Sequence, residues 1–107
     1  MDTLLVISTF PDAETARQIG TQLVAKQLAA CVNLLPSPVT SIYRWRGEIE
    51  TADETLALFK TTRAAYPAFE KALAAAHPYE IPEILALPID TGLQAYQAWV
   101  AENTAPS

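Results

Sequence analysis

The chain has 107 residues, half of them hydrophobic and 18% charged, with a formal net charge of −5 at neutral pH. This length and composition indicate one globular domain, residues 1–107, rather than a disordered chain. An acidic chain without a cluster of Lys and Arg repels phosphate backbones, which argues against nucleic-acid binding, and no apolar run is long enough to span a membrane.

The first part of the chain predicts a strand, a helix and a second strand. Residues 3–10 are largely apolar and uncharged, which is typical of a strand buried on both faces. This segment lacks a basic region and runs into Pro11, so we expect a first strand rather than a signal peptide. Asp12 is a good N-cap for a helix over 12–28, in which apolar residues recur at helical spacing. Residues 30–35 are apolar again and end at a Pro-Ser-Pro bend.

A long antiparallel hairpin is predicted next. Residues 39–46 alternate between two faces, Gly47 marks a turn, residues 48–50 begin the return, and the run over 54–61 continues the second arm. Long strand edges with unpaired backbone groups often pair with another chain. Aromatic and arginine side chains, which are enriched at protein interfaces, gather near the tip; they are Tyr43, Arg44, Trp45 and Arg46. We expect an oligomer interface there, the alternative being that the aromatic rings fold back onto their own domain.

The last part predicts a helix, a strand and a further helix. The helix begins near residues 65–66, because Pro67 is tolerated only in a first turn, and it ends at His77. A strand over 81–89 and a helix over 92–102 follow. The order is βαββαβ with an added C-terminal helix, which predicts an α+β, ferredoxin-like sandwich with a long β-hairpin. Many unrelated functions share this order, so the fold class alone predicts no activity.

Four segments together resemble the CutA family. They are residues 28–33 (LAACVN), 41–50 (SIYRWRGEIE), 60–62 (KTT) and 77–84 (HPYEIPEI), and they occur in the family's order over most of the chain. The resemblance implies subunits that assemble as a homotrimer, with long hairpins that pair between subunits. It also implies a non-enzymatic role in tolerance of divalent cations, chiefly copper, and an architecture related to PII-type signalling trimers.

Two residues are candidate copper ligands. His77 is the only histidine, and imidazole suits copper; alternatively it stabilises the C-terminus of the second helix. Cys31 offers a soft thiolate for Cu(I), or it is a small hydrophobic residue of the core. Some bacterial relatives carry a cysteine and a second histidine where this chain has Ser8 and Ala76, which weakens the case for direct copper binding. Two residues do not make a tight site, so we expect no tightly bound cofactor unless a neighbouring subunit adds ligands.

The single cysteine also bears on location. One cysteine forms no intrachain disulfide and supplies no paired thiolates for a zinc finger. We therefore expect a reducing compartment, the cytoplasm.

A further group of residues is a candidate for a cleft between subunits: Lys60, Tyr79, Glu80 and Glu83. Lys60 ends an apolar strand, where its amino group meets an anion or simply reaches solvent. The carboxylates bind a hard cation or are solvated. No Gly-rich phosphate loop and no nucleophile–base set is visible, so we expect no enzyme. The alternative function is a PII-like signalling or adaptor trimer that binds a small anion or a partner protein at intersubunit clefts.

Overall fold

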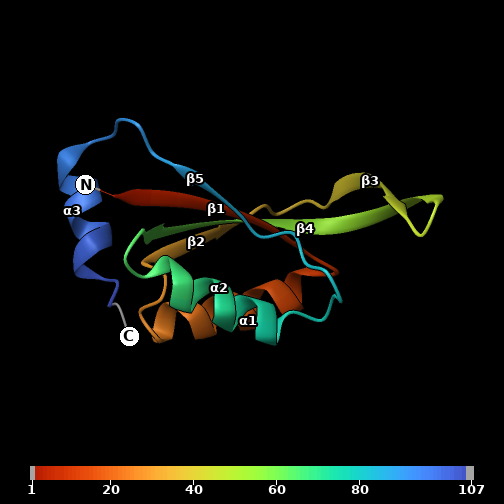
Figure 1. The fold of residues 1–107 in the computed structure, drawn as a ribbon, viewed down its shortest axis with the longest axis horizontal. Helices are drawn as coiled ribbons and strands as arrows, with labels where there is room; N and C mark the ends of the chain where they lie inside the picture. Colours follow the sequence, from red (N-terminus) through yellow and green to blue (C-terminus); the bar gives the residue numbers. More distant parts are fainter. Residues whose placement is uncertain (1, 106–107) are drawn as a thin grey trace.

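The computed structural model describes residues 2–105 and shows a twisted antiparallel sheet with helices on one face (Figure 1). Its elements are β1 (Thr3–Phe10), α1 (Ala13–Ala25), β2 (Cys31–Leu34), β3 (Val39–Trp45), β4 (Glu48–Thr62), α2 (Tyr66–Ala76), β5 (Leu85–Pro88) and α3 (Gln94–Glu102). The strand order is β2-β4-β1-β5, and β3 pairs with β4 beyond this path. This is the ferredoxin-like arrangement with a hairpin and a helix added, so the predicted fold class is confirmed. Among the residues described, no helix combines the length and apolar character that crossing a bilayer requires.

β1 lies between β4 and β5, and its two faces differ in burial. Leu4, Val6 and Phe10 lie on the face that α1 and α2 cover, with at most 4% of each side chain exposed. Leu5 and Ile7, on the opposite face, are only half-buried. The prediction of a strand buried on both faces is therefore wrong for the single subunit, because α1 and α2 cover one face only (Figure 1).

α1 begins where it was predicted but ends three residues earlier. Asp12 accepts a hydrogen bond from the Thr15 backbone N–H at 2.7 Å, which is N-cap geometry. At the other end Gln27 adopts a positive φ of 59°, and the Leu28 N–H bonds to the Leu23 carbonyl oxygen at 3.0 Å. This left-handed C-cap ends the helix and returns Leu28 to the core, where it packs with Leu23.

The hairpin differs from the prediction in its return arm. Arg46 and Gly47 both have positive φ, 52° and 84°, so the chain reverses in a tight two-residue turn. The return arm begins at Glu48 as predicted, but β3 pairs only with residues 48–54 and not with the rest of the run over 54–61. The rest of β4, a single 15-residue strand, pairs with β1 and β2. The hairpin therefore projects from the sheet, at the opposite end of the molecule from α3 (Figure 1).

The C-terminal third matches the prediction in its helices more closely than in its strand. α2 begins at Tyr66, carries Pro67 in its first turn and ends before His77. α3 begins two residues later than predicted. The strand predicted over 81–89 is reduced to β5, and residues 78–84 form an irregular segment. Proline has no N–H to donate to a strand ladder, so Pro82 disfavours pairing in the first part of the predicted strand, whereas Pro88 is tolerated at the end of β5.

Candidate functional site

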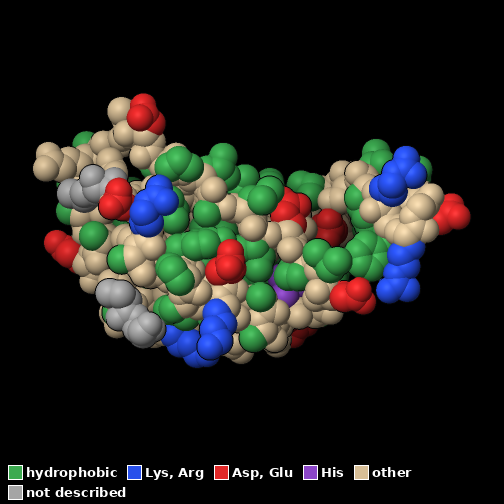
Figure 2. Space-filling view, viewed as in Figure 1, with side chains coloured by type: hydrophobic (Ala, Val, Ile, Leu, Met, Phe, Trp, Pro, Cys, Tyr) green, Lys and Arg blue, Asp and Glu red, His purple; other side chains and the backbone are tan. Residues whose placement is uncertain are grey.

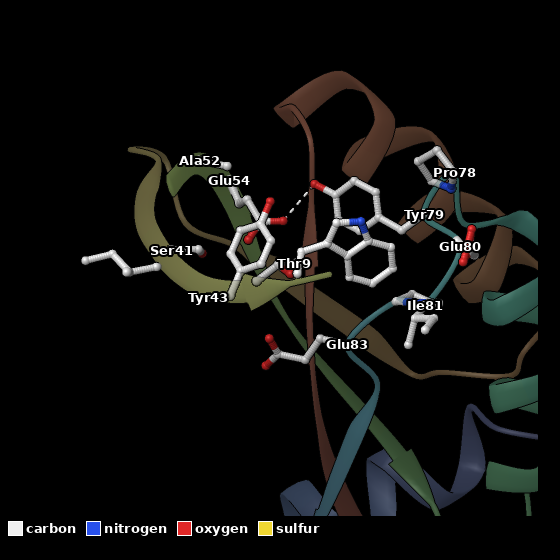
Figure 3. A pocket seen from close by; sticks show the side chains of 13 residues that line it. Thr9, Ser41, Tyr43, Ala52, Glu54, Pro78, Tyr79, Glu80, Ile81 and Glu83 are labelled. Atoms are coloured by element: carbon white, nitrogen blue, oxygen red, sulfur yellow. Dashed lines mark hydrogen bonds between the residues drawn. The ribbon is translucent and has the colours of Figure 1, made fainter. Parts of the chain in front are cut away.

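A cleft of about 930 Å³ lies between the β3–β4 hairpin and the irregular segment after α2 (Figure 3). Aromatic, aliphatic and proline side chains, carboxylates and small polar groups line it, and no Lys or Arg is among the lining residues. They are Thr9, Ser41, Ile42, Tyr43, Trp45, Ala52, Glu54, Pro78, Tyr79, Glu80, Ile81, Pro82 and Glu83. The structure thus brings Tyr79, Glu80 and Glu83 of the predicted cleft together with Tyr43 and Trp45 of the predicted interface.

His77 holds the start of this segment against β1. Its ring stacks on Phe10, with centroids 4.7 Å apart. Nε2 lies 2.8 Å from the Thr9 carbonyl oxygen, which only accepts, so Nε2 carries the proton and donates. Nδ1 accepts a hydrogen bond from the Tyr79 backbone N–H at 3.1 Å. Burial lowers the pKa of His77, which favours the neutral imidazole at pH 7. Nε2 then holds the ring on Thr9, and Nδ1 holds the backbone of Tyr79.

Tyr79 links the segment to the hairpin. Its phenol donates to Glu54 Oε2 at 2.7 Å, as Figure 3 shows. Burial, assisted by Glu54, raises the pKa of Tyr79, so the phenol remains a donor at neutral pH. Glu54 is only 8% exposed, and within residues 2–105 no Lys or Arg forms an ion pair with it. Buried carboxylates are normally paired with a cation.

Glu54 was not predicted from the sequence as a residue of the site. Its signal was weak, because a single charge at the start of an otherwise apolar run suggests the solvated end of a strand. Only the pairing of Glu54 with Val39 and its contact with Tyr79 show that it is buried beside the cleft.

The outer edge of the cleft holds a cation from the chain itself. The Arg46 guanidinium carbon lies 5.3 Å from the centroid of the Trp45 ring, and Arg46 Nη2 lies 3.6 Å from Glu80 Oε1. The two charged side chains are 73% and 67% exposed, so their pairing adds little stability. Trp45 is half-buried, and it lines the cleft of its own subunit together with Tyr43. The interface role of Tyr43, Arg44, Trp45 and Arg46 stays a prediction.

Cys31 lies on the open face of the sheet, away from the cleft. It is half-buried, and its Sγ lies 3.3 Å from Tyr96 Oη of α3; this contact raises the pKa of Tyr96 to about 12. The expectation of a buried core cysteine is wrong, because β2 is an edge strand whose Cys31 side chain faces away from α1 and α2. Its partner across the ladder, Lys60, donates from Nζ to Asn33 Oδ1, so Lys60 also lies outside the cleft.

One subunit does not bring the two predicted copper ligands together. Cys31 pairs with Lys60 of β4, and Lys60 pairs with Leu5 of β1, so Cys31 lies beside Leu5 in the sheet. His77 instead bonds to Thr9, further along β1. Four residues along a strand separate these positions by about 13 Å. Over the described part of the chain, no three His, Cys, Asp or Glu residues form a group that could hold a metal ion. His77 and Cys31 remain predicted ligands.

Known proteins of one family match this chain over almost its whole length. The family model described as CutA1 divalent ion tolerance protein matches residues 4–103. The divalent-cation tolerance protein CutA of Thermus thermophilus is 49% identical over 100 residues, which cover 94% of this chain and 96% of that protein. Protein CutA of Mus musculus is 43% identical over 96 residues; the match covers 90% of this chain and 54% of that protein, so the chain spans about half of that relative.

The fold comparison gives the same result. A solved structure of the divalent cation tolerance protein Cut A1 from Thermus thermophilus superposes with a TM-score of 0.92 at 48% identity, covering 96% of this chain and 99% of that one. Sequence and fold therefore agree over nearly every element described above. The chain belongs to the CutA1 divalent ion tolerance protein family.

Proposed function

We propose that the chain forms a non-enzymatic, cytoplasmic homotrimer that contributes to tolerance of divalent cations, chiefly copper. The observation that supports assembly is the apolar face that α1 and α2 leave open. Leu85 and Leu87 of β5 are 59% and 44% exposed, and Tyr96 and Trp99 of α3 are 42% and 41% exposed. Figure 2 shows hydrophobic side chains gathered on the surface over this part of the sheet. Closed symmetric assembly removes such a surface from water.

The assembly is tested by its mass. Light scattering of the wild-type protein should give three chain masses. Leu87→Asp places a charge on the open face and should give one chain mass, whereas Ala75→Asp, on the exposed side of α2, should leave the trimer intact. A wild-type protein of one chain mass over a wide concentration range would contradict the proposal.

The metal role is proposed to need more than one subunit. A tight transition-metal site takes three or four ligands, and in the described residues no subunit assembles such a group by itself. Both His77 nitrogens are engaged, and the half-buried Cys31 lies on the face where subunits would meet. We therefore expect weak copper binding at a boundary between subunits.

Calorimetric titration with copper tests this site. The trimer should give a saturable heat, and the dissociated Leu87→Asp variant should lose it. His77→Ala and Cys31→Ser assign the ligands: a lost heat in either variant includes that residue in the site, and wild-type heats in both variants remove both residues from it. Equal copper binding by the trimer and by the dissociated variant would contradict a shared site.

A second candidate is a PII-like signalling or adaptor trimer, and the cleft of about 930 Å³ is the observation that favours it. Its lining carries three glutamates and no Lys or Arg, which makes a small anion a poor ligand. A thermal shift with sodium orthophosphate in the absence of metal would support anion binding. No shift would leave a cation or a partner protein as the occupant of the cleft.

A further inference from the structure

Three aromatic rings face the cleft from two separate parts of the chain. Tyr43 and Trp45 come from β3, and Tyr79 comes from the segment after α2. The face of an aromatic ring attracts cations, and several rings around one space recognise quaternary or substituted ammonium groups. Tyr79 is fixed by two hydrogen bonds, one to His77 and one to Glu54, so this ring is positioned before any ligand arrives.

A negative charge lies among these rings without a cationic partner. Glu54 points from β4 toward the Tyr79 hydroxyl and lines the cleft (Figure 3). It is more than nine-tenths buried, and within the described part of the chain its carboxylate accepts one hydrogen bond, from Tyr79. Glu83 lines the same space from the opposite segment. A carboxylate that has lost much of its water and has no counter-ion gains most from a cation placed beside it.

One cation of the chain already lies against an aromatic ring and a carboxylate of this surface. The guanidinium of Arg46 lies over the Trp45 ring and beside Glu80, at the outer edge of the cleft. A guanidinium is a delocalised, weakly hydrated organic cation. A compact metal ion is a poorer fit, because the described residues offer no group of three ligands. The lining therefore suits an organic cation better than an anion or a metal ion.

We propose that this cleft binds a small organic cation of the substituted ammonium class, held between the rings of Tyr43, Trp45 and Tyr79 and neutralised by Glu54. This binding function is separate from copper tolerance, since it uses none of the predicted copper ligands directly. The ammonium group lies against the rings.

The test uses the full chain in its native assembly and two probes of nearly the same shape. Choline carries a quaternary nitrogen, and 3,3-dimethyl-1-butanol carries a neutral carbon in its place. The chain has two tryptophans, so the NMR signal of the Trp45 indole N–H reports on the cleft and that of Trp99, on α3, is an internal control. Choline should shift the Trp45 signal saturably and leave Trp99 unchanged, and the neutral isostere should bind about tenfold more weakly.

Two variants remove charge from the cleft. Glu54→Gln keeps the size of the side chain and can still accept from Tyr79, and it should weaken choline binding about tenfold. Glu83→Gln is an exposed substitution that should fold in any case and should weaken binding less. Glu102→Gln, at the end of α3, is the matched control and should bind choline as the wild type does.

Two results would overturn the proposal. Equal binding of choline and its neutral isostere would show an apolar pocket without selectivity for charge. An unresponsive Trp45 signal in the folded assembly would show that choline does not enter the cleft. Neither result depends on the copper titration, so the two proposals fail separately.

Discussion

Tyr79 and Tyr66 make the same hydrogen bond in two different environments. Each phenol donates to a glutamate Oε2 at 2.7 Å, Tyr79 to Glu54 and Tyr66 to Glu70. Glu54 is 8% exposed, whereas Glu70 lies on the solvent side of α2. Substitution of each tyrosine by phenylalanine removes the hydroxyl and keeps the ring. The two variants therefore isolate the effect of carboxylate burial.

The structure predicts different losses of stability for the two variants. A hydrogen bond to a charged group contributes about 1.5–3 kcal/mol, and Tyr79→Phe leaves the buried Glu54 without its partner. Tyr66→Phe leaves Glu70 free to bond with water, and helix-surface pairs four residues apart contribute about 0.2–0.5 kcal/mol. Burial raises the pKa of Tyr66 to about 12 and that of Tyr79 further, so both phenols are protonated at neutral pH.

Equilibrium unfolding in urea, followed by tryptophan fluorescence, measures both losses. The protein concentration is kept equal for all variants, because assembly makes apparent stability depend on it. Tyr79→Phe should lower the free energy of unfolding by at least about 1 kcal/mol more than Tyr66→Phe. Equal losses would refute the conclusion that Glu54 depends on Tyr79.

Two further predictions concern buried polar groups. The folded-state pKa of His77 lies below its ordinary value of 6.5, so its stabilising effect is complete above that pH and is lost as the pH falls through the folded-state pKa. Between about pH 7 and about pH 5, the free energy of unfolding in urea should therefore fall more steeply for wild type than for His77→Gln, by up to about 1.4 kcal/mol per pH unit. Parallel plots of this free energy against pH for the two proteins would contradict the prediction. Ser8 and Thr61 both carry fully buried hydroxyls, but Thr61 donates to the Leu28 carbonyl oxygen at 2.6 Å, whereas Ser8 Oγ has no partner among residues 2–105. Thermal or urea unfolding should show that Thr61→Val lowers the free energy of unfolding by about 1–3 kcal/mol, whereas Ser8→Ala leaves it unchanged or raises it. Equal losses in the two variants would count against the role of the Thr61 hydrogen bond.

Local signals predicted the elements whose ends are determined by local chemistry. β1 has the predicted bounds because an uncharged apolar run meets a proline. α2 begins and ends as predicted because Pro67 fits only a first turn and Pro78 disfavours continuation. The fold class followed from the order of these elements.

Features that depend on pairing across the chain were not predictable in this way. The tight turn at Arg46 and Gly47 fixes which residues face β3, and that register buries Glu54. A core position was one of the two interpretations of Cys31, yet its place on an edge strand leaves it half-buried. His77 was weighed as a helix-terminal residue or a copper ligand. Its bonds to Thr9 and Tyr79 arise only when β1 and α2 meet.

The central proposal is a trimer in which copper is held by more than one subunit. Anomalous diffraction at the copper edge, from crystals of the assembled protein soaked in copper, tests it directly. We expect copper at a boundary between subunits, with ligands from two chains. Copper bound wholly by the residues of one chain, or no ordered copper in the trimer, would contradict the account.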